Sequence, residues 1–344
     1  MDSSDSHERE RRRFYLLTHP RSASHLLQRI LGMEKPSHLA SRDRGAYFFR
    51  PLIALVHQLK VHGKSVDRWT PDERSQMKKC YQDCFDELVK YVEMAEAEGK
   101  LVFVKEHVDF MVEPTAQTRF LFGQDRVKEL PWTVQAVSTS GADVTHSSLN
   151  VTVLPDEVLR VWLPVFLVRH PGLAFPSLYR TILDNQGLEA AKAEGVALEM
   201  TLHWSRTLYD WYTQHLSKPE LRSKSDSNIT WPLVIDADDV MTEPRVIERL
   251  CEIVEINHTR LQSTWAPAAT EELARLHPVA RRMQSTLSAS TGIMKGKTSA
   301  NFNIDMEATR WREEFGEHEG ERMEKWVRAA MPDYEFMKAR KLKP

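Results

Sequence analysis

The sequence predicts an α/β fold in which helices cover both faces of a central parallel sheet, giving three α/β/α layers. Four short apolar runs, at residues 14–18, 101–104, 161–168 and 232–235, have the length and composition of buried strands. Longer helical patterns separate them, and strands that alternate with helices are typical of a parallel sheet. The sequence contains no internal repeat that would favour a different architecture.

Composition and charge place the chain among globular proteins and argue against a general nucleic-acid binder. Of the 344 residues, 41% are hydrophobic and 28% are charged, an ordinary balance for a folded protein. The 47 basic residues nearly cancel the 49 acidic ones, whereas nucleic-acid binding usually brings a basic excess. A local anion site is compatible with this balance, because a few arginines and lysines can converge without changing the total.

No segment of the sequence indicates secretion or membrane insertion, so we expect a cytoplasmic protein. Residues 1–13 are charged, lack the apolar core of a signal peptide and read as a disordered tail. No apolar run approaches the roughly 18 residues needed to cross a bilayer. Cys80, Cys84 and Cys251 are too few for a disulfide framework. We expect them to be unpaired thiols, and we expect no metal site.

The helices can be placed by their caps and breaks. Residues 24–30 follow the first strand, and residues 71–98 form a long amphipathic helix. Thr70 and Glu73 have the spacing of a capping box, with a proline at the first helical position. Further helices are expected near 51–60, over 188–215 and 244–254, and through the C-terminal third with a break at 291–303.

Residues 115–160 show neither a clear helical pattern nor a clear strand pattern. They are rich in Thr, Ser and Gly, and an irregular connection of this length in a compact domain usually carries function. We therefore expect this segment to act as a lid or as a wall of the binding pocket.

The segment Thr18-His-Pro-Arg-Ser-Ala-Ser24, between the first strand and the first helix, is the sharpest signal for chemistry. A helix N-terminus presents free backbone N–H groups and the positive end of the helix dipole. Arg21 adds a fork of donors, and Ser22 and Ser24 add hydroxyls, so the segment can cradle a phosphate or a sulfate. The alternative is an ordinary strand-to-helix turn with a capping serine.

This segment resembles the 5'-phosphosulfate loop of sulfotransferases that use 3'-phosphoadenosine 5'-phosphosulfate (PAPS), commonly T-x-P-K/R-S-G-T/S. Ala23 stands where the family has a glycine, and alanine is a mild replacement provided that its φ is negative. Five positions match the family pattern, namely Thr18, Pro20, Arg21, Ser22 and Ser24.

Two further sites are similar to the same family. After the third apolar run, Arg169 and Ser177 stand eight positions apart, as in the family's 3'-phosphate motif. After the second run, Lys105-Glu-His107 resembles the K-x-H segment that carries a catalytic base. A histidine near neutrality can take the proton of an attacking hydroxyl. His107 is one of 14 histidines in the sequence. Taken alone, it could equally have a purely structural role at the end of a strand.

The C-terminal third extends the resemblance. Residues 294–296 (Met-Lys-Gly) and 311–315 (Trp-Arg-Glu-Glu-Phe) are similar to the family's R-K-G and W-x-x-x-F elements. The resemblance implies that this region covers the nucleotide and that Lys295, Gly296 and Lys297 bind it. It further implies a P-loop NTPase-like sulfotransferase fold, as a single domain over residues 14–337 with an insertion at about 115–160.

The function implied by the resemblance is transfer of a sulfuryl group from PAPS to a small hydroxylated or phenolic acceptor, with PAP as product and no metal. His107 would act as base, Arg21 would stabilise the leaving phosphate, and Lys105 would steady the sulfuryl oxygens. The resemblance assigns nucleotide binding to Ser22, Ala23, Ser24, His25, Arg169, Ser177 and Lys295, together with Arg21, Gly296 and Lys297.

Two alternatives remain open. A related enzyme could use sulfonation to create a leaving group for elimination or cyclisation, and Ala23 leaves room for a nucleotide-binding homologue without catalysis. Ordinary ATPase chemistry is disfavoured, because the Gly-Lys-Thr at 296–298 has Thr291 where a Walker A motif needs a glycine. We expect no nucleic-acid or membrane partner, and the sequence leaves a homodimer open. Aromatic residues that fit either a pocket or the core are Phe48, Phe49, Trp69, Tyr81 and Trp204.

Overall fold

The structure, a computed structural model, describes residues 12–33, 39–40, 47–136, 144–216 and 229–344. Its centre is a five-stranded sheet in the order β2-β3-β1-β4-β5, in which all neighbouring strands are parallel. The predicted α/β class is therefore confirmed. The strands are β1 (Arg13–Thr18), β2 (Leu39–Ala40), β3 (Leu101–His107), β4 (Leu163–Val168) and β5 (Leu233–Asp236).

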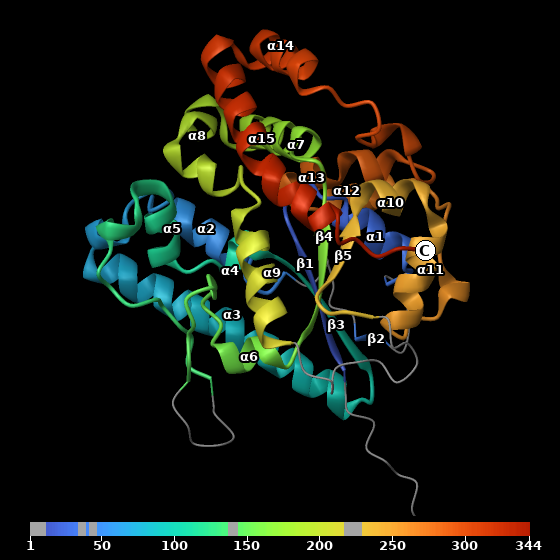
Figure 1. The fold of residues 1–344 in the computed structure, drawn as a ribbon, viewed down its shortest axis with the longest axis horizontal. Coiled ribbons are helices and arrows are strands. Elements are labelled where there is room, and N and C mark those ends of the chain that lie inside the picture. The colour runs from blue at the N-terminus through green and yellow to red at the C-terminus, as the bar shows by residue number, and fades with distance from the viewer. Residues whose placement is uncertain (1–11, 34–38, 41–46, 137–143, 217–228) are drawn as a thin grey trace, which may run out of the picture.

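Helices cover both faces of this sheet, which confirms the predicted three layers. In Figure 1, α1 (Ser24–Ile30), α10 (Ala237–Thr242) and α11 (Pro244–Ile253) lie to the right of the strands, and α3 (Pro71–Ala97) lies to their left. None of the described helices is long and apolar enough to cross a membrane. The others are α2 (Pro51–Gln58), α4 (Val108–Met111), α5 (Pro114–Phe122), α6 (Asp156–Arg160), α7 (Pro171–Gln186), α8 (Leu188–Lys192), α9 (His203–His215), α12 (Thr270–Arg275), α13 (Pro278–Ala289), α14 (Ile304–Phe315) and α15 (Glu317–Lys338).

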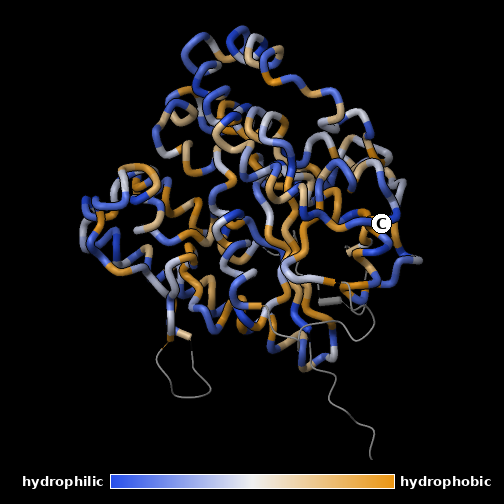
Figure 2. The backbone as a smooth tube through the Cα atoms, viewed as in Figure 1, coloured by the Kyte–Doolittle hydropathy of each residue, from blue (hydrophilic) through white to orange (hydrophobic). Residues whose placement is uncertain are grey.

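The central strands are apolar at consecutive positions because both of their faces are covered. Phe14, Leu16, Val165 and Phe166, from β1 and β4, are fully buried. Figure 2 shows hydrophobic residues concentrated along these strands, and hydrophilic ones along the outer helices. The short apolar runs of the sequence therefore mark the centre of the core.

The three central strands end at the same edge of the sheet. Thr18 at the end of β1 lies opposite His107 of β3 and opposite Leu167 of β4. β3 extends past the apolar run 101–104, so that Lys105 and His107 belong to the strand rather than to the loop behind it. The segments that leave these strands start side by side, at the edge where open parallel sheets bind ligands.

The capping box predicted for α3 is present. Thr70 Oγ1 accepts a hydrogen bond from Glu73 N at 3.2 Å, and Glu73 Oε2 accepts one from Thr70 N at 2.6 Å. Pro71 takes the first helical position, where its missing N–H costs nothing. The helix runs to Ala97, one residue short of the predicted end.

The single helix predicted over 188–215 is wrong. The chain forms α8, then a 3-10 turn over Glu194–Leu198, and then α9. Gly195 packs against Gly63, where an added Cβ would meet both the Gly63 backbone and the His62 ring. The helical pattern is broken there because this close approach of two backbone segments requires glycine, a poor helix former.

The irregular connection expected over residues 115–160 is found only in its middle, because α5 and α6 occupy its two ends and the described residues between 127 and 155 form no helix or strand. The segment begins in a helix, α5, whose N-terminus is capped by the Glu113 carboxylate, which accepts hydrogen bonds from Thr115 N and Ala116 N. Trp132 and Val153 are buried in the hydrophobic core. None of the described residues of this segment lines the large cavity of the next section. The segment extends the core instead of walling the site, because its apolar side chains pack inward.

Candidate functional site

The loop between β1 and α1 has an alternating backbone conformation. Arg21 and Ala23 have φ angles of 65° and 66°, in the left-handed region. Such a conformation costs a residue with a Cβ roughly 1–2 kcal/mol. A negative φ, the condition under which alanine would be a mild replacement for glycine, is therefore not met, and Ala23 is strained. Left-handed residues within a turn direct successive N–H groups into one concavity, which suits an anion.

The N-terminus of α1 opens into this concavity. Ala23 is its N-cap residue, and no side chain caps the helix. The first N–H groups of a helix have no partner within it, and they carry the positive end of the dipole. The Ser22 hydroxyl is buried and has no hydrogen-bond partner among the described residues. The loop thus presents donors that an anion would satisfy.

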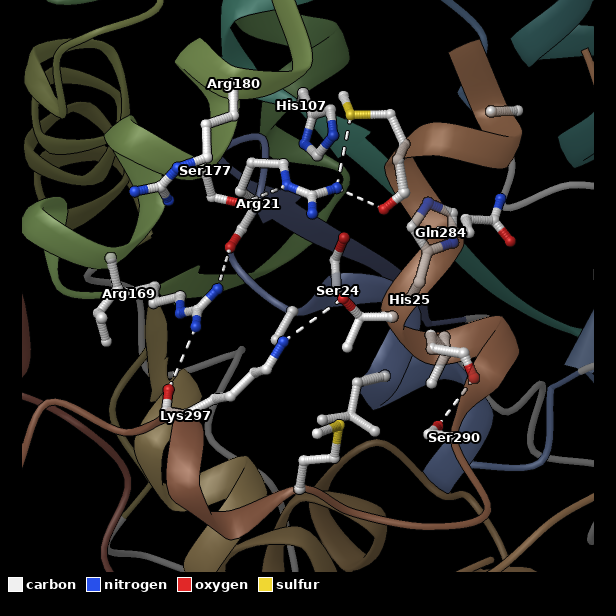
Figure 3. Close-up of a pocket in the computed structure, with 18 of the residues that line it drawn as sticks. Arg21, Ser24, His25, His107, Arg169, Ser177, Arg180, Gln284, Ser290 and Lys297 are labelled. Atoms are coloured by element: carbon white, nitrogen blue, oxygen red, sulfur yellow. Dashed lines mark hydrogen bonds between the residues drawn. The ribbon is translucent and has the colours of Figure 1, made fainter. Parts of the chain in front are cut away.

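Arg21 crosses from this loop to two other elements (Figure 3). Its Nε donates to Ser177 Oγ on α7 at 3.0 Å, and its Nη1 donates to the Met283 carbonyl on α13. Burial, followed by the charges of Arg169 and Arg282, lowers the pKa of Arg21 to about 10. The guanidinium is thus charged at neutral pH among like charges.

Arg169 joins the loop to a segment far away in the sequence. It follows β4, and its Nη1 donates to the Arg21 carbonyl at 2.9 Å while its Nη2 donates to the Lys297 carbonyl at 3.2 Å. Both contacts are drawn in Figure 3. The Nε of Arg169 is buried without a partner among the described residues. Two backbone carbonyls hold this arginine, and burial lowers its pKa while the charges of Asp238 and Asp236 offset part of that effect.

The basic segment around residues 295–297 is held in place by two contacts. Ser299 donates to the Asp238 carboxylate from its N at 3.0 Å and from its Oγ at 2.5 Å. Phe302 packs on the His170 ring, with centroids 4.5 Å apart, and on Gly172, where a Cβ would collide with the phenyl ring. Glycine at 172 therefore allows this segment to approach Arg169.

The two lysines of this segment differ in position. Lys297 lines the cavity, and its Nζ lies 3.4 Å from Thr286 Oγ1. Burial, and then the charges of Arg169 and Arg21, lower the pKa of Lys297. Gly296 also lines the cavity, whereas Lys295 is exposed and lies outside the lining. The placement favours Lys297 over Lys295 as the anion contact.

The hydrogen bonds around His107 define its tautomer. Thr18 Oγ1 donates its one proton to the Glu106 carbonyl at 3.1 Å and lies 2.6 Å from His107 Nδ1. When Thr18 gives its proton to that carbonyl, it accepts from Nδ1–H of His107, and this tautomer has its lone pair on Nε2. Burial, followed by the charges of Lys105, His19 and His25, lowers the pKa of His107 well below its usual value. His107 is thus a neutral imidazole that can accept a proton at Nε2.

Lys105 does not reach the cavity as expected. It is fully buried, and its Nζ donates to Gln28 Oε1 and lies 4.4 Å from the centroid of the Tyr47 ring. Tyr47 lines the cavity, packs 4.6 Å from His107 by ring centroids, and has its hydroxyl 3.4 Å from Ser24 Oγ. Tyr47 therefore stands between Lys105 and the cavity. Sequence reasoning missed it, since no recognisable motif precedes it.

These groups meet in a single cavity of about 580 Å³. None of the described residues in its lining is Asp or Glu. Helix α13, which sequence reasoning did not connect to the site, contributes much of the wall opposite the loop. Among the described residues no group of three or more His, Cys, Asp or Glu side chains could hold a metal ion. The predicted site residues in the lining are Arg21, Ala23, Ser24, His25, His107, Arg169, Ser177, Gly296 and Lys297.

Comparison with known proteins identifies the family of this chain. The chain is 41% identical over 333 residues to a protein named sulfotransferase ppzF from Metarhizium rileyi (strain RCEF 4871), which covers 96% of each chain. It is 42% identical over 335 residues to sulfotransferase ppzF from Metarhizium majus (strain ARSEF 297), covering 96% of this chain and 97% of that relative. The chain belongs to the sulfotransferase family. No family model matches the sequence of this sulfotransferase.

Among solved structures, a sulfotransferase domain from the Synechococcus PCC 7002 olefin synthase is similar to this sulfotransferase. The two are 14% identical, with a TM-score of 0.38, and the match covers 87% of this chain and 90% of the other.

The aromatic residues that fitted either a pocket or the core all belong to the core of this sulfotransferase. They are buried, and none lines the cavity. Phe315, from the W-x-x-x-F element, packs on Tyr179 and also lies outside the lining. The residues concerned are Phe48, Phe49, Trp69, Tyr81 and Trp204.

Substitution of Ala23 by glycine tests the strained loop. Because glycine adopts a positive φ without a steric penalty, Ala23→Gly should raise the free energy of unfolding by about 1 kcal/mol. The matched control is Ala54→Gly in α2, at an exposed helical position, which should lower it by about 1 kcal/mol. Urea unfolding of the two variants measures both. Equal losses in the two variants would contradict a left-handed residue 23.

Proposed function

We propose that this sulfotransferase transfers the sulfuryl group of PAPS to a hydroxyl of a small-molecule acceptor, with His107 as the base. The observation that carries the proposal is the meeting, in one cavity, of His107, the helix N-terminus after Arg21, and the cationic side chains of Arg169 and Lys297. A donor with two separate phosphate groups fits two separate groups of cationic and N–H donors.

The donor's 5'-phosphate is assigned to the loop. The N–H groups of residues 22–25 would bind it, in the concavity that the left-handed Arg21 and Ala23 create. The guanidinium of Arg21 is now bound to Ser177 and to the Met283 carbonyl, and it would share these contacts with the bridging oxygen of the leaving phosphate. Charge on that oxygen grows as the bond to sulfur breaks, so a fixed cation there favours the transition state.

The 3'-phosphate is assigned to Arg169, Ser177 and Lys297. Each lines the cavity, and each comes from a different segment, namely the end of β4, helix α7 and the segment held by Asp238. The unpartnered Nε of Arg169 supports the assignment, because a buried donor without an acceptor costs free energy. This group would select a 3'-phosphorylated nucleotide over ADP.

In the proposed reaction, the acceptor's hydroxyl oxygen forms a bond to sulfur while the bond between sulfur and the bridging oxygen of the 5'-phosphate breaks. His107 Nε2 takes the hydroxyl proton, and PAP leaves with the bonding electron pair. Positioning and charge stabilisation would supply most of the rate, as in phosphoryl transfer. Since Lys105 is buried behind Tyr47, we assign it a positioning role, and we assign contact with the sulfuryl oxygens to the Tyr47 hydroxyl and Arg21.

Removal of the base tests this reaction. Incubation with PAPS and a panel of phenols and alcohols, followed by mass spectrometry, should give a product heavier by one sulfuryl group. His107→Ala should lower kcat by about 100-fold or more, because it removes general-base catalysis. The thermal shift produced by PAP should persist in this variant. His258→Ala, at an exposed position, is the control and should retain full turnover. Near-full activity of His107→Ala would refute the assignment.

The two lysines near α13 test the 3'-phosphate contact. Lys297→Met should weaken PAP binding by about tenfold, because it removes a charge-assisted contact, and should leave the weaker ADP binding unchanged. Lys295→Met is the matched control, two positions away and outside the cavity lining, and should bind PAP as the unmodified protein does. Calorimetric titration measures all four affinities. A loss confined to Lys295→Met would reverse the assignment.

The pH dependence follows from the lowered pKa of His107. Only neutral His107 accepts a proton, and its pKa lies well below 6.5, so kcat/KM should stay level as the pH falls from 8 to 6.5 and decline only at lower pH. Thr18→Val removes the acceptor for Nδ1–H and should lower kcat more than it changes KM, whereas Thr18→Ser should restore kcat. A decline in kcat/KM centred at or above pH 6.5 would contradict the neutral, buried base.

A further inference from the structure

One arginine in the cavity is left unused by the proposed donor site. Arg50 lines the cavity and is exposed, and its guanidinium makes no hydrogen bond or ion pair with any described residue. Arg180, another lining arginine, is instead bound to Glu314 by two hydrogen bonds of 2.5 and 2.7 Å. Among the described residues, therefore, no carboxylate pairs with the charge of Arg50.

The position of Arg50 is unfavourable for a cation in purely structural terms. It is the N-cap residue of α2, with φ of -58°, and no side chain caps this helix. The N-terminus of a helix carries the positive end of its dipole, so a positive side chain there is destabilising and an acidic one would be preferred. A bound anion would remove this penalty.

The backbone around Arg50 is fixed relative to His107. The buried Glu106 carboxyl accepts hydrogen bonds from Phe49 N at 3.0 Å and from His107 N at 3.1 Å. Burial raises the pKa of Glu106 to about 8, and these N–H groups offset part of that rise. The segment before α2 is thereby tied to the end of β3, which holds the backbone next to Arg50 in place relative to the candidate base.

Apolar side chains line the same cavity as Arg50 and His107. The rings of Tyr47 and Phe110 pack on His107, with centroid distances of 4.6 and 5.0 Å. Ile53 follows Arg50 by three positions in α2, on the same helix face, and also lines the cavity. These walls would accommodate an apolar or aromatic body, with a charged group at its far end.

We propose that the acceptor is a hydroxylated carboxylic acid whose carboxylate pairs with Arg50 while its hydroxyl meets His107. This inference rests on the proposed function, because the acceptor site is identified only by the proposed sulfuryl transfer. The forked donors of an arginine match the two oxygens of a carboxylate. None of the described lining residues is Asp or Glu, and Arg21, Arg169 and Lys297 line the same cavity, so a cationic amine would meet these like charges.

Matched pairs of acceptors test the proposal. Hydroxylated aromatic and aliphatic acids, such as 4-hydroxyphenylacetate, are compared with their methyl esters by kcat/KM. At least one acid should exceed its ester by tenfold or more. In Arg50→Gln, the ratio of acid to ester should fall at least tenfold, while Arg50→Lys should keep part of it and Arg50→Glu should favour the ester. The control Arg68→Gln, an exposed arginine outside the cavity, should leave the ratio unchanged.

Binding separates failure of this inference from failure of the proposed reaction. The same acids and esters are titrated into protein saturated with PAP, where the acids should bind more tightly and lose this preference in Arg50→Gln. An acid preference in binding with no product from any acceptor would support the anion site and overturn the proposed reaction. Product without any acid preference, or a change in the KM for PAPS alone in Arg50→Gln, would overturn the role of Arg50.

Discussion

The pairing of β1 with β3, in which Thr18 lies opposite His107, is the constraint on which the rest of the site depends. It brings the loop to which we assign the 5'-phosphate and the imidazole of His107 to one edge of the sheet. The 2.6 Å contact between Thr18 Oγ1 and His107 Nδ1 leaves Nε2 able to accept a proton. A one-residue shift of either strand would point its side chains to the opposite face and separate the two. The buried apolar runs that fix this register therefore also fix the chemistry.

Electrostatics provide the second constraint. Arg21, Arg169 and Lys297 converge from three segments, and each has a pKa below its usual value because of burial and, for Arg21 and Lys297, like charges nearby. Arg169 is held by backbone carbonyls, which orient it. The resulting cavity is positively charged before any ligand enters it. Because these charges are already in place, the site needs little rearrangement when an anion binds, whereas water must reorient its dipoles around the same anion.

Much of the fold could be predicted because its strands are buried on both faces. Such strands are apolar at consecutive positions, so they can be recognised in the sequence as continuous apolar runs. The placement of Arg169 and Ser177 in one cavity followed from a strand end and the helix after it. The prediction of one helix over 188–215 was wrong because Gly195 packs against Gly63, which is far away in the sequence. The local hydrophobic pattern contains no sign of this contact. The irregular segment expected over residues 115–160 was too long at its start, where Glu113 caps α5 although Thr, Ser and Gly suggested a loop.

Other features of the site could not be predicted, since they depend on tertiary contacts without a local signature. Tyr47 and Arg50 face the cavity because Glu106 ties their segment to β3, and α13 closes it through contacts that include the Arg21 bond to Met283. Lys105 matched a motif, but its place inside a strand covered on both faces put its ammonium behind Tyr47.

A crystal structure with bound PAP tests the central claim most directly. We expect the 5'-phosphate to accept hydrogen bonds from the N–H groups of residues 22–25. The 3'-phosphate should lie against Arg169, Ser177 and Lys297, and Arg21 should turn from the Met283 carbonyl toward the 5'-phosphate. A nucleotide bound outside this cavity, or one with its two phosphates exchanged between these groups, would contradict the account.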